Sequence, residues 1–424
     1  MLSTLRNAWR IPEIRKKIIF TLLMLLVFRL GSSIPVPYMN KDIIGSIFQQ
    51  SQGGILQFLD LMGGGTLSNF SIFATNIYPY ITASIVIQLL TIAIPRLEEL
   101  AKEGEEGKKK ITKYTRYTAI GLALIQAIGY TFGLFSTALQ TTNSLQNIIV
   151  IITMVAGTAF LMWIGDMITE KGIGNGISLI IFIGIISRLP KDLINTFNLV
   201  RIGELSIIKT LIFGVVFLVI IAFVVALQEG ERRIPVQYAK RVVGRKMYGG
   251  QSTHIPVKVS MAGVMPVIFA SSLLAFPQTI ALFTKGAPST WITKWLTPQG
   301  NIGIWIYSIL NIALIMFFTY FYTAIQFNTV EYAKNLQQNG GFIPGIRPGR
   351  PTSEHLNKVV TRITFVGGLA LAVLASLPII LSKIFGMNVN FGGTSIIIVV
   401  GVALETVKQI EAQMLMRHYK GFLN

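Results

Sequence analysis

Hydrophobic blocks of about 20 residues alternate along this chain with short basic stretches. A helix rises about 1.5 Å per residue, so a block of this length spans the hydrocarbon core of a bilayer. Of the 37 Lys and Arg residues, 28 lie in six stretches that the blocks would place on one side of a membrane: residues 1–17, 95–116, the neighbourhood of 171, 228–258, 331–362 and 408 onward. Because Lys and Arg are retained on the cytoplasmic side, the alternation predicts a multi-pass helical membrane protein with both termini in the cytoplasm.

The composition excludes several other classes of protein. Hydrophobic residues make up 52% and charged residues 13% of the 424 positions, which is too apolar for a soluble fold. The net charge of +19 is therefore concentrated on loops, where it can meet anionic lipid, acidic protein or RNA. The absence of cysteine excludes disulfides and thiol nucleophiles. His254, His355 and His418 lie far apart in charged segments, so we expect no metal site and no cofactor.

The hydrophobic blocks predict an all-α fold with ten transmembrane helices. We place the helices at about residues 18–36, 71–94, 117–136, 147–167, 177–194, 207–227, 261–283, 303–326, 360–381 and 393–410. The first block contains Arg29 and no convincing cleavage site, so we interpret it as a retained span and not as a signal peptide. The spans divide five and five between an N-terminal half, residues 1–195, and a C-terminal half, residues 196–424. An odd number of spans in each half would give the halves opposite orientations, an arrangement that commonly builds a pathway between inverted repeats.

The longest outside segment, residues 37–70, contains an apolar stretch that is too short to span a membrane. Residues 55–62 have helical apolar spacing and are followed by three glycines, Gly63, Gly64 and Gly65, which give the backbone conformational freedom. Two interpretations stay open. The segment is either an amphipathic helix on the outer membrane surface or a short re-entrant helix on a flexible hinge, able to occupy a cavity.

The two long inside loops, about residues 228–260 and 327–359, carry much of the positive charge. In the first loop, two extended runs around a glycine-containing turn predict a β-hairpin bearing cations. In the second, residues 339–351 are too rich in Gly and Pro for a helix and predict an exposed tip that presents Arg347 and Arg350. Topology determination and attraction to lipid explain part of this charge, but compact basic loops also suit a large anionic partner such as ribosomal RNA.

The sequence contains no recognisable catalytic constellation, so we do not expect an enzyme. Residues 172–176 (GIGNG) resemble a dinucleotide-binding loop only superficially, because they follow a membrane span and not a strand. Asp166 and Glu405 lie toward the inside ends of their spans, and no carboxylate is evident at the midplane, where an ion-coupled transporter usually keeps ion ligands. An ion-coupled secondary transporter of a small solute remains the alternative function.

A set of short motifs resembles the SecY family of bacterial protein-translocation channels over essentially the whole chain. The motifs occur in the family's order: YTRY (114–117), ITEKGIGNGIS (168–178), QSTH (251–254), MAGV (261–264), IFASS (268–272), GIRPG (345–349) and FGGTS (391–395). The resemblance implies a non-enzymatic channel in the bacterial cytoplasmic membrane that translocates unfolded secretory polypeptides and releases hydrophobic helices laterally into lipid. It also implies an hourglass of two five-span halves, closed outside by a plug helix at about residues 55–67 with its hinge at the glycine run.

The resemblance further assigns roles to particular side chains. The constriction of the channel would be a ring of aliphatic residues, placed by the local motifs at Ile77, Ile81, Ile177, Ile181, Ile268 and Ile398. A hydrophobic constriction resists ion leakage by dewetting, and aliphatic side chains give a passing polypeptide no fixed partner. The channel would open sideways between spans two and seven, with Gln88, Ser271 and Ser272 along the lateral gate.

The partners that the resemblance implies are the SecE and SecG subunits, the SecA motor ATPase, the translating ribosome, signal peptides with their nascent chains, and membrane lipids. SecA or the ribosome would bind the two long inside loops. The residues that would make these contacts are Arg233, Lys240, Arg241, Arg245, Lys246 and Arg347.

Overall fold

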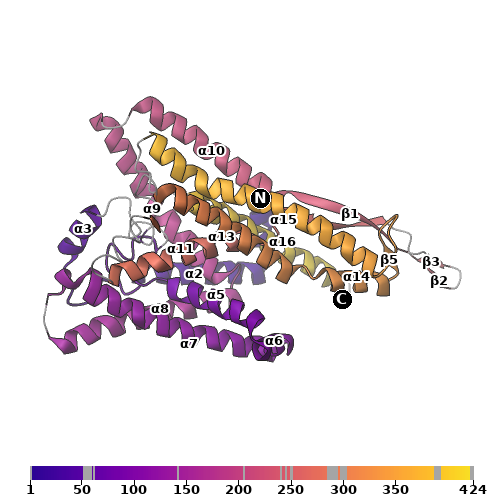
Figure 1. Cartoon of the computed structure of the whole chain (residues 1–424), viewed down its shortest axis with the longest axis horizontal. Helices are drawn as coiled ribbons and strands as arrows, with labels where there is room; N and C mark the ends of the chain where they lie inside the picture. Colours follow the sequence, from indigo (N-terminus) through magenta and orange to yellow (C-terminus); the bar gives the residue numbers. More distant parts are fainter. Residues whose placement is uncertain are drawn as a thin grey trace.

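The computed structural model describes residues 2–50, 60, 63–140, 143–203, 206–238, 241–243, 246–248, 252–283, 295–296, 303–385 and 393–420. Within these residues, helices run side by side along the long axis of the molecule, and a β-hairpin projects beyond one end of them (Figure 1). The helical class expected from the hydrophobic blocks is confirmed.

The described helices fall into two consecutive sets. The first set comprises α1 (Leu2–Arg10), α2 (Pro12–Gly31), α3 (Lys41–Gln50), α5 (Tyr78–Ala93), α6 (Pro95–Lys102), α7 (Glu105–Gly129), the π-helix η1 (Tyr130–Leu134), the 3-10 helix η2 (Ser136–Ala138), α8 (Ser144–Lys171) and α9 (Gly176–Ile202). The second set comprises α10 (Ile207–Glu229), α11 (Met265–Phe283), α13 (Gly303–Gln326), α14 (Thr329–Gln338), α15 (Arg350–Phe385) and α16 (Gly393–Lys420).

Among the described residues, five helical runs are long and apolar enough to cross a membrane. They are Glu105–Leu134, Ser144–Lys171, Thr210–Glu229, Gly303–Gln338 and Arg350–Leu377. The bent pair α5 and α6, whose axes differ by 100°, would make a sixth span. Helix α2 has 20 residues and is long enough to cross, but it carries basic residues near one end and Arg29 near the other, so it is less apolar than these five runs. The number of ten spans therefore stays a prediction.

The second predicted span differs from the observed helix at both ends. Ser71 forms an isolated β-bridge with Pro35, residues 72–77 form turns, and α5 begins only at Tyr78, with Pro79 in its first turn. Proline fits a first turn because its missing N–H would have no helical partner there. At the other end, Ile94 precedes Pro95 and has extended backbone (φ −110°, ψ 113°), since a residue before proline disfavours the helical region. The chain therefore turns sharply into α6.

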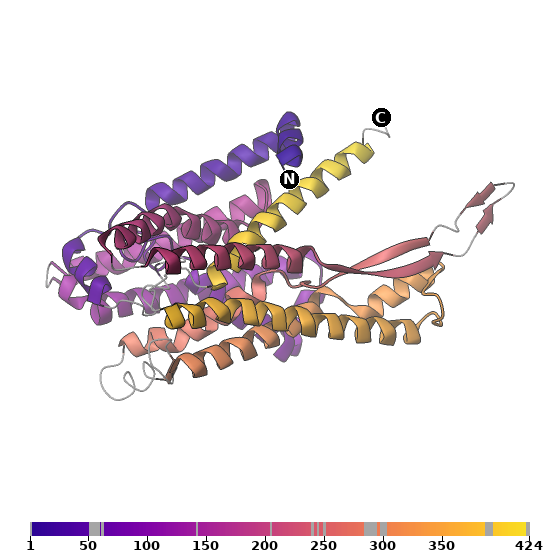
Figure 2. The ribbon, with the colours of Figure 1, turned by 90° about the horizontal axis from the view of Figure 1, so that it is seen from above.

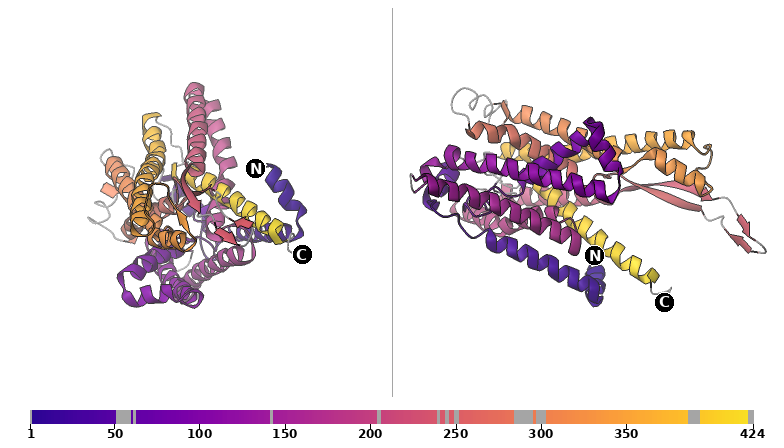
Figure 3. Two further views of the ribbon diagram at one scale, coloured as in Figure 1. Left: turned by 90° about the vertical axis from the view of Figure 1, so that its right-hand side faces the viewer. Right: turned by 90° about the horizontal axis from the view of Figure 1, so that it is seen from below.

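The helices of each set pack mainly on members of their own set. In the first set α5 contacts α7, α7 contacts α8, and α8 contacts α9, while α2 lies against α8 and α9. In the second set α11 contacts α13, α13 contacts α15, and α16 contacts α10 and α15. Contacts of α11 with α5 and of α16 with α9 join the two sets. Seen end-on, α7 and α8 lie below the orange helices of the second set (Figure 3).

The projecting hairpin confirms the strand pair predicted for the first inside loop. Strands β1 (Glu231–Tyr238) and β4 (Ser252–Lys258) are antiparallel, with Glu231 opposite Lys258, and β2 (Arg241–Val243) pairs with β3 (Lys246–Tyr248). A third strand, β5 (Gly341–Phe342), pairs with the other edge of β1 and so joins the second inside loop to the first. The sequence did not predict this strand. Both termini lie toward the end from which the hairpin projects (Figure 2).

Candidate functional site

The six isoleucines expected to form the constriction all lie within or against the main apolar core. Ile77 directly precedes α5, Ile81 lies in α5, Ile177 and Ile181 in α9, Ile268 in α11 and Ile398 in α16. Five of them are buried members of one core cluster, and Ile177 is partly buried and packs against it. We call these six residues the isoleucine cluster. Segments that are far apart in the sequence thus contribute isoleucine side chains, which have no hydrogen-bonding group, to the same apolar core. Their arrangement as a ring stays a prediction.

The glycine run forms a tight turn packed against α9. Gly64 and Gly65 have left-handed backbone, with φ of 69° and 89°, and the Gly65 N–H donates to the carbonyl oxygen of Asp60 at 2.9 Å. A left-handed glycine with a bond reaching back five residues is the geometry of a Schellman helix C-terminus. A Cβ on Gly64 would lie 2.8 Å from the backbone of Gly184 in α9, so only glycine fits. We call residues 63–65 the glycine turn.

The predicted plug helix at about residues 55–67 lies largely outside the described residues, which here are Asp60 and 63 onward. The described part places the glycine turn beside the segment that leads into α5, because a Cβ on Gly63 would lie 3.0 Å from the side chain of Asn76, the neighbour of Ile77. Movement of the turn as a hinge stays a prediction.

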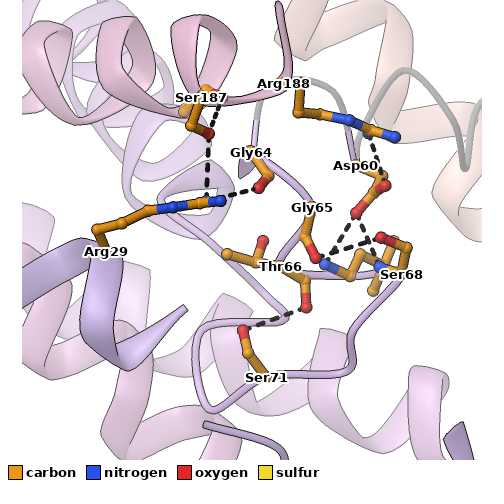
Figure 4. Close-up of polar contacts among 11 residues, drawn as sticks. Arg29, Asp60, Gly64, Gly65, Thr66, Ser68, Ser71, Ser187 and Arg188 are labelled. Carbon is orange, nitrogen blue, oxygen red and sulfur yellow. Dashed lines mark hydrogen bonds and ion pairs between the residues drawn. The ribbon is translucent and has the colours of Figure 1, made fainter. Parts of the chain in front are cut away.

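Asp60 is the centre of the polar contacts around the glycine turn (Figure 4). Its Oδ1 accepts hydrogen bonds from the backbone N–H groups of Leu67 at 3.0 Å and Ser68 at 2.7 Å. Its Oδ2 accepts from Nη1 of Arg188, in α9, at 2.6 Å. The Asp60 side chain is 1% exposed and that of Arg188 is 16% exposed, so this ion pair is largely shielded from solvent.

A second arginine holds the other side of the glycine turn. Arg29 of α2 donates through Nη1 to the carbonyl oxygen of Gly64 at 3.1 Å and to Oγ of Ser187 at 3.2 Å (Figure 4). Sequence reasoning noticed Arg29 only as a charge in a span and missed Asp60 and Arg188. A signal was present: Asp60 is the only carboxylate between residues 43 and 97, and both arginines lie outside the six basic stretches.

The residues expected along the lateral gate are partly brought together. Gln88 of α5 accepts a hydrogen bond at Oε1 from the hydroxyl of Tyr322 in α13 at 2.5 Å, and its Nε2 donates to Ser84 Oγ at 3.1 Å. Ser271 and Ser272 are buried in α11, which packs against α5, and the Ser272 hydroxyl donates to the carbonyl oxygen of Ile268. The polar link from Gln88 therefore reaches α13 and not the two serines. Tyr322 was missed by the sequence analysis.

We call the three strands β4, β1 and β5 the projecting sheet. The expected partner-binding residues lie on or near this sheet. Arg233 is exposed on β1 and pairs with Glu231 at 2.8 Å, and Arg347 is exposed in the turn before α15. Arg241 lies in β2 and Lys246 in β3, while Lys240 and Arg245 lie outside the described residues.

A separate apolar cluster makes the two inside loops one structural unit. It joins Ile234 and Val236 of β1, Val257 of β4, Leu336 of α14 and Leu356 of α15. Buried and exposed residues alternate along β1, as expected of a strand with one face on a core.

The described residues contain no group of three or more His, Cys, Asp or Glu side chains able to hold a metal ion. Asp166, one of the carboxylates considered for ion coupling, pairs with Arg116 of α7 at 2.6 Å.

Comparisons with known proteins agree on one family. A family model described as SecY matches residues 71–407. Proteins named protein translocase subunit SecY are 47% identical in Halalkalibacterium halodurans, 44% in Bacillus subtilis and 42% in Thermotoga maritima. Each alignment covers 100% of this chain and at least 98% of the relative.

Solved structures show the same fold at lower sequence identity. A protein-conducting channel aligns with a TM-score of 0.68 and 20% identity over 95% of this chain and 93% of that one. A SecY structure concerned with the plug domain, the closed state and the membrane seal aligns with a TM-score of 0.67 and 18% identity, over 95% of this chain and 92% of that one. Canine Sec61 in a ribosome–channel complex aligns with a TM-score of 0.62 and 18% identity, over 95% and 93% of the two chains.

Proposed function

This chain belongs to the SecY family, and from that premise we propose that it is the channel through which unfolded secretory polypeptides cross the bacterial cytoplasmic membrane. It is a protein translocase subunit of a channel family and not of a family of enzymes, so the energy for transport comes from a partner. The observation that carries the proposal is that the isoleucine cluster draws on both sets of helices and is buried within one apolar core, as the constriction requires.

The isoleucine cluster is the constriction of this channel. A narrow aliphatic ring disfavours a continuous column of water, so ions find no hydrated path at rest. The same side chains offer a passing polypeptide neither charge nor hydrogen-bond partner, and therefore sequences of many kinds slide through without being held. At rest the plug at about residues 55–67 lies outside this ring, and the glycine turn is its hinge.

The channel consists of ten spans in two inverted halves, residues 1–195 and 196–424, with both termini in the cytoplasm. The preference of each set of helices for its own members supports this division. The position of the basic hairpin and both termini toward one end of the bundle supports the orientation, since basic segments stay cytoplasmic (Figure 2).

Hydrophobic helices leave the channel sideways between α5 and α11, with α7 and α13 alongside. The contact of α5 with α11 and the bond between Gln88 and Tyr322 close this seam in the described structure. Gln88, Ser271 and Ser272 line it.

The projecting sheet is the docking site for the SecA motor or the translating ribosome, and the chain works with SecE and SecG. Pairing of β5 with β1 fixes the two inside loops to each other, so their cations act as one surface. Two proteins of the same fold, canine Sec61 and yeast Ssh1, are known in ribosome-bound complexes. RNA phosphates attract clustered Lys and Arg. Arg233, Lys240, Arg241, Arg245, Lys246 and Arg347 supply the contacts.

Crosslinking tests the pore directly, because the chain has no cysteine of its own. We expect a single cysteine at Ile81 or Ile268 to crosslink to a secretory precursor stalled midway. A matched cysteine at Val215, which is exposed on α10, would crosslink to lipid and not to the precursor. A stalled precursor that is translocated normally yet reaches neither pore position would show that the pore assignment is wrong.

A further inference from the structure

We infer that Asp60 and Arg188 are positioning residues that latch the plug segment to α9 while the channel is closed. The inference rests on the proposed function, since it requires the segment that ends at the glycine turn to be the plug. Arg188 lies 128 residues after Asp60 in the sequence, so the pair ties the turn to a separate helix. Departure of the plug from α9 must therefore break this bond.

The carboxylate of Asp60 fixes three points at once. Two backbone N–H groups beyond the glycine turn, those of Leu67 and Ser68, bind Oδ1, and the guanidinium of Arg188 binds Oδ2. A carboxylate that accepts several donors in a dry site holds its geometry tightly. The turn on one side and α9 on the other thus share a single buried anion.

The backbone contact of the turn with α9 places the latch in register. The missing Cβ of Gly64 allows its backbone to meet that of Gly184, one turn of helix before Arg188. Arg29 holds the same point from α2, by bonding both Gly64 and Ser187. The close packing of Gly64 on Gly184 and the ion pair of Asp60 with Arg188 together hold the glycine turn in one position on α9.

Such a latch is strong only while it is dry. The attraction between two charges falls steeply when water enters between them, because the dielectric constant rises. A polypeptide that widens the channel and admits water would therefore weaken the bond, and both charges would be hydrated after release. A contact made only by apolar packing would lack this response.

The test is resting ion conductance of the purified complex, with its partner subunits, in planar bilayers. We expect D60N to raise conductance about tenfold or more, because it leaves Arg188 as an uncompensated, largely buried charge. R188Q should have a smaller effect, since Asp60 keeps its two N–H donors. The double variant D60N/R188Q should leak less than D60N, because removing both members of a buried pair costs less than removing one. D42N on α3 and K191Q, one turn beyond Arg188 and exposed, serve as controls.

Several outcomes would overturn the latch. Unchanged conductance in D60N and R188Q, or purely additive effects in the double variant, would show that the two side chains act independently. If neither single variant assembles, restored assembly in the double variant supports the pair, and its absence refutes it. Deletion of residues 55–67 separates this failure from that of the proposed function: an unchanged resting conductance after deletion would refute the plug itself.

Discussion

The side chains of the isoleucine cluster and those around the glycine turn are stabilised in opposite ways. The isoleucines are buried among other apolar residues and have no polar group to satisfy. Asp60, Arg188 and Arg29 instead bond to named partners at 2.6 to 3.2 Å. The isoleucine cluster excludes water because it has no hydrogen-bonding side chains, whereas the glycine turn is held in place by specific hydrogen bonds and an ion pair.

The difference follows from what each region must tolerate. A constriction that passes polypeptides of any sequence cannot contain fixed partners, because each partner would slow some of them. A closing element must return to one position, and directional bonds with a close backbone contact define a position better than apolar packing does. Changes in the two regions should therefore fail differently, and the experiments below separate them.

The largest effect is expected from Gly64→Val in the glycine turn. A β-branched residue at φ 69° is strained, and its side chain would collide with the backbone of Gly184. We expect the closed state to be destabilised by roughly 3 kcal/mol or more, with a permanent ion leak measured as bilayer conductance. Gly45→Val in α3 is the control, because a Cβ there meets nothing within 4 Å. A tight resting channel in Gly64→Val would contradict the seated turn.

Ile268→Asn tests the other region. A buried amide without a partner costs about 1–3 kcal/mol and provides a site for water, so the cluster should wet and conduct ions. We expect faster ion flux from vesicles and export of precursors with defective signals. Ile268→Val keeps the apolar surface and should change neither. Unchanged ion flux and unchanged signal selectivity in Ile268→Asn would show that the isoleucine cluster does not seal the channel.

The sequence predicted the features that depend on local pattern. Apolar blocks of the right length predicted helices, and two extended runs around a turn predicted the hairpin of β1 and β4. Local pattern could not set the start of α5, because residues 71–77 are themselves largely apolar and Pro79 is the main local mark of the boundary.

Local sequence pattern could not predict contacts between residues that are distant in the chain, for a physical reason. The pair of Asp60 with Arg188, and that of Gln88 with Tyr322, join helices whose relative placement is set by tertiary packing. The isolated charges of Asp60 and Arg188 mark them as unusual in the sequence, but nothing local identifies each as the partner of the other. The isoleucine cluster was located only through motifs shared with a family, since an isoleucine in an apolar span carries no signal of its own.

Tyr322→Phe should have a smaller effect, confined to the lateral seam. It removes the hydroxyl that bonds Gln88 and leaves an amide oxygen without this partner. We expect a loss of about 1 kcal/mol in seam closure, which is roughly fivefold in the ratio of inserted to translocated marginally hydrophobic helices. Tyr320→Phe, two residues away and partly exposed, is the matched control, because its hydroxyl donates only a long bond of 3.5 Å to the carbonyl oxygen of Thr361. Equal insertion ratios in the two variants would show that the bond between Tyr322 and Gln88 does not control the lateral gate. A rise in resting conductance in Tyr322→Phe would show that the bond instead helps to seal the channel.

The smallest effect is expected at the projecting sheet, where charges stay in water. Arg347 has no ion-pair partner among the described residues, whereas Arg350 pairs with Glu354 at 3.0 Å. Arg347→Gln should weaken ribosome binding by roughly twofold to threefold, and Arg350→Gln less, because its charge is already partly neutralised.

The dependence on salt decides whether Arg347 contacts phosphate. Losing one phosphate contact lowers the slope of log affinity against log salt by a little under one, so the difference between Arg347→Gln and the unchanged chain should shrink as salt rises. An affinity loss that does not depend on salt would indicate packing of the Arg347 side chain and not its charge. In that case the projecting sheet would bind its partner through close packing, as the glycine turn packs on α9. It would not bind mainly through its positive charge.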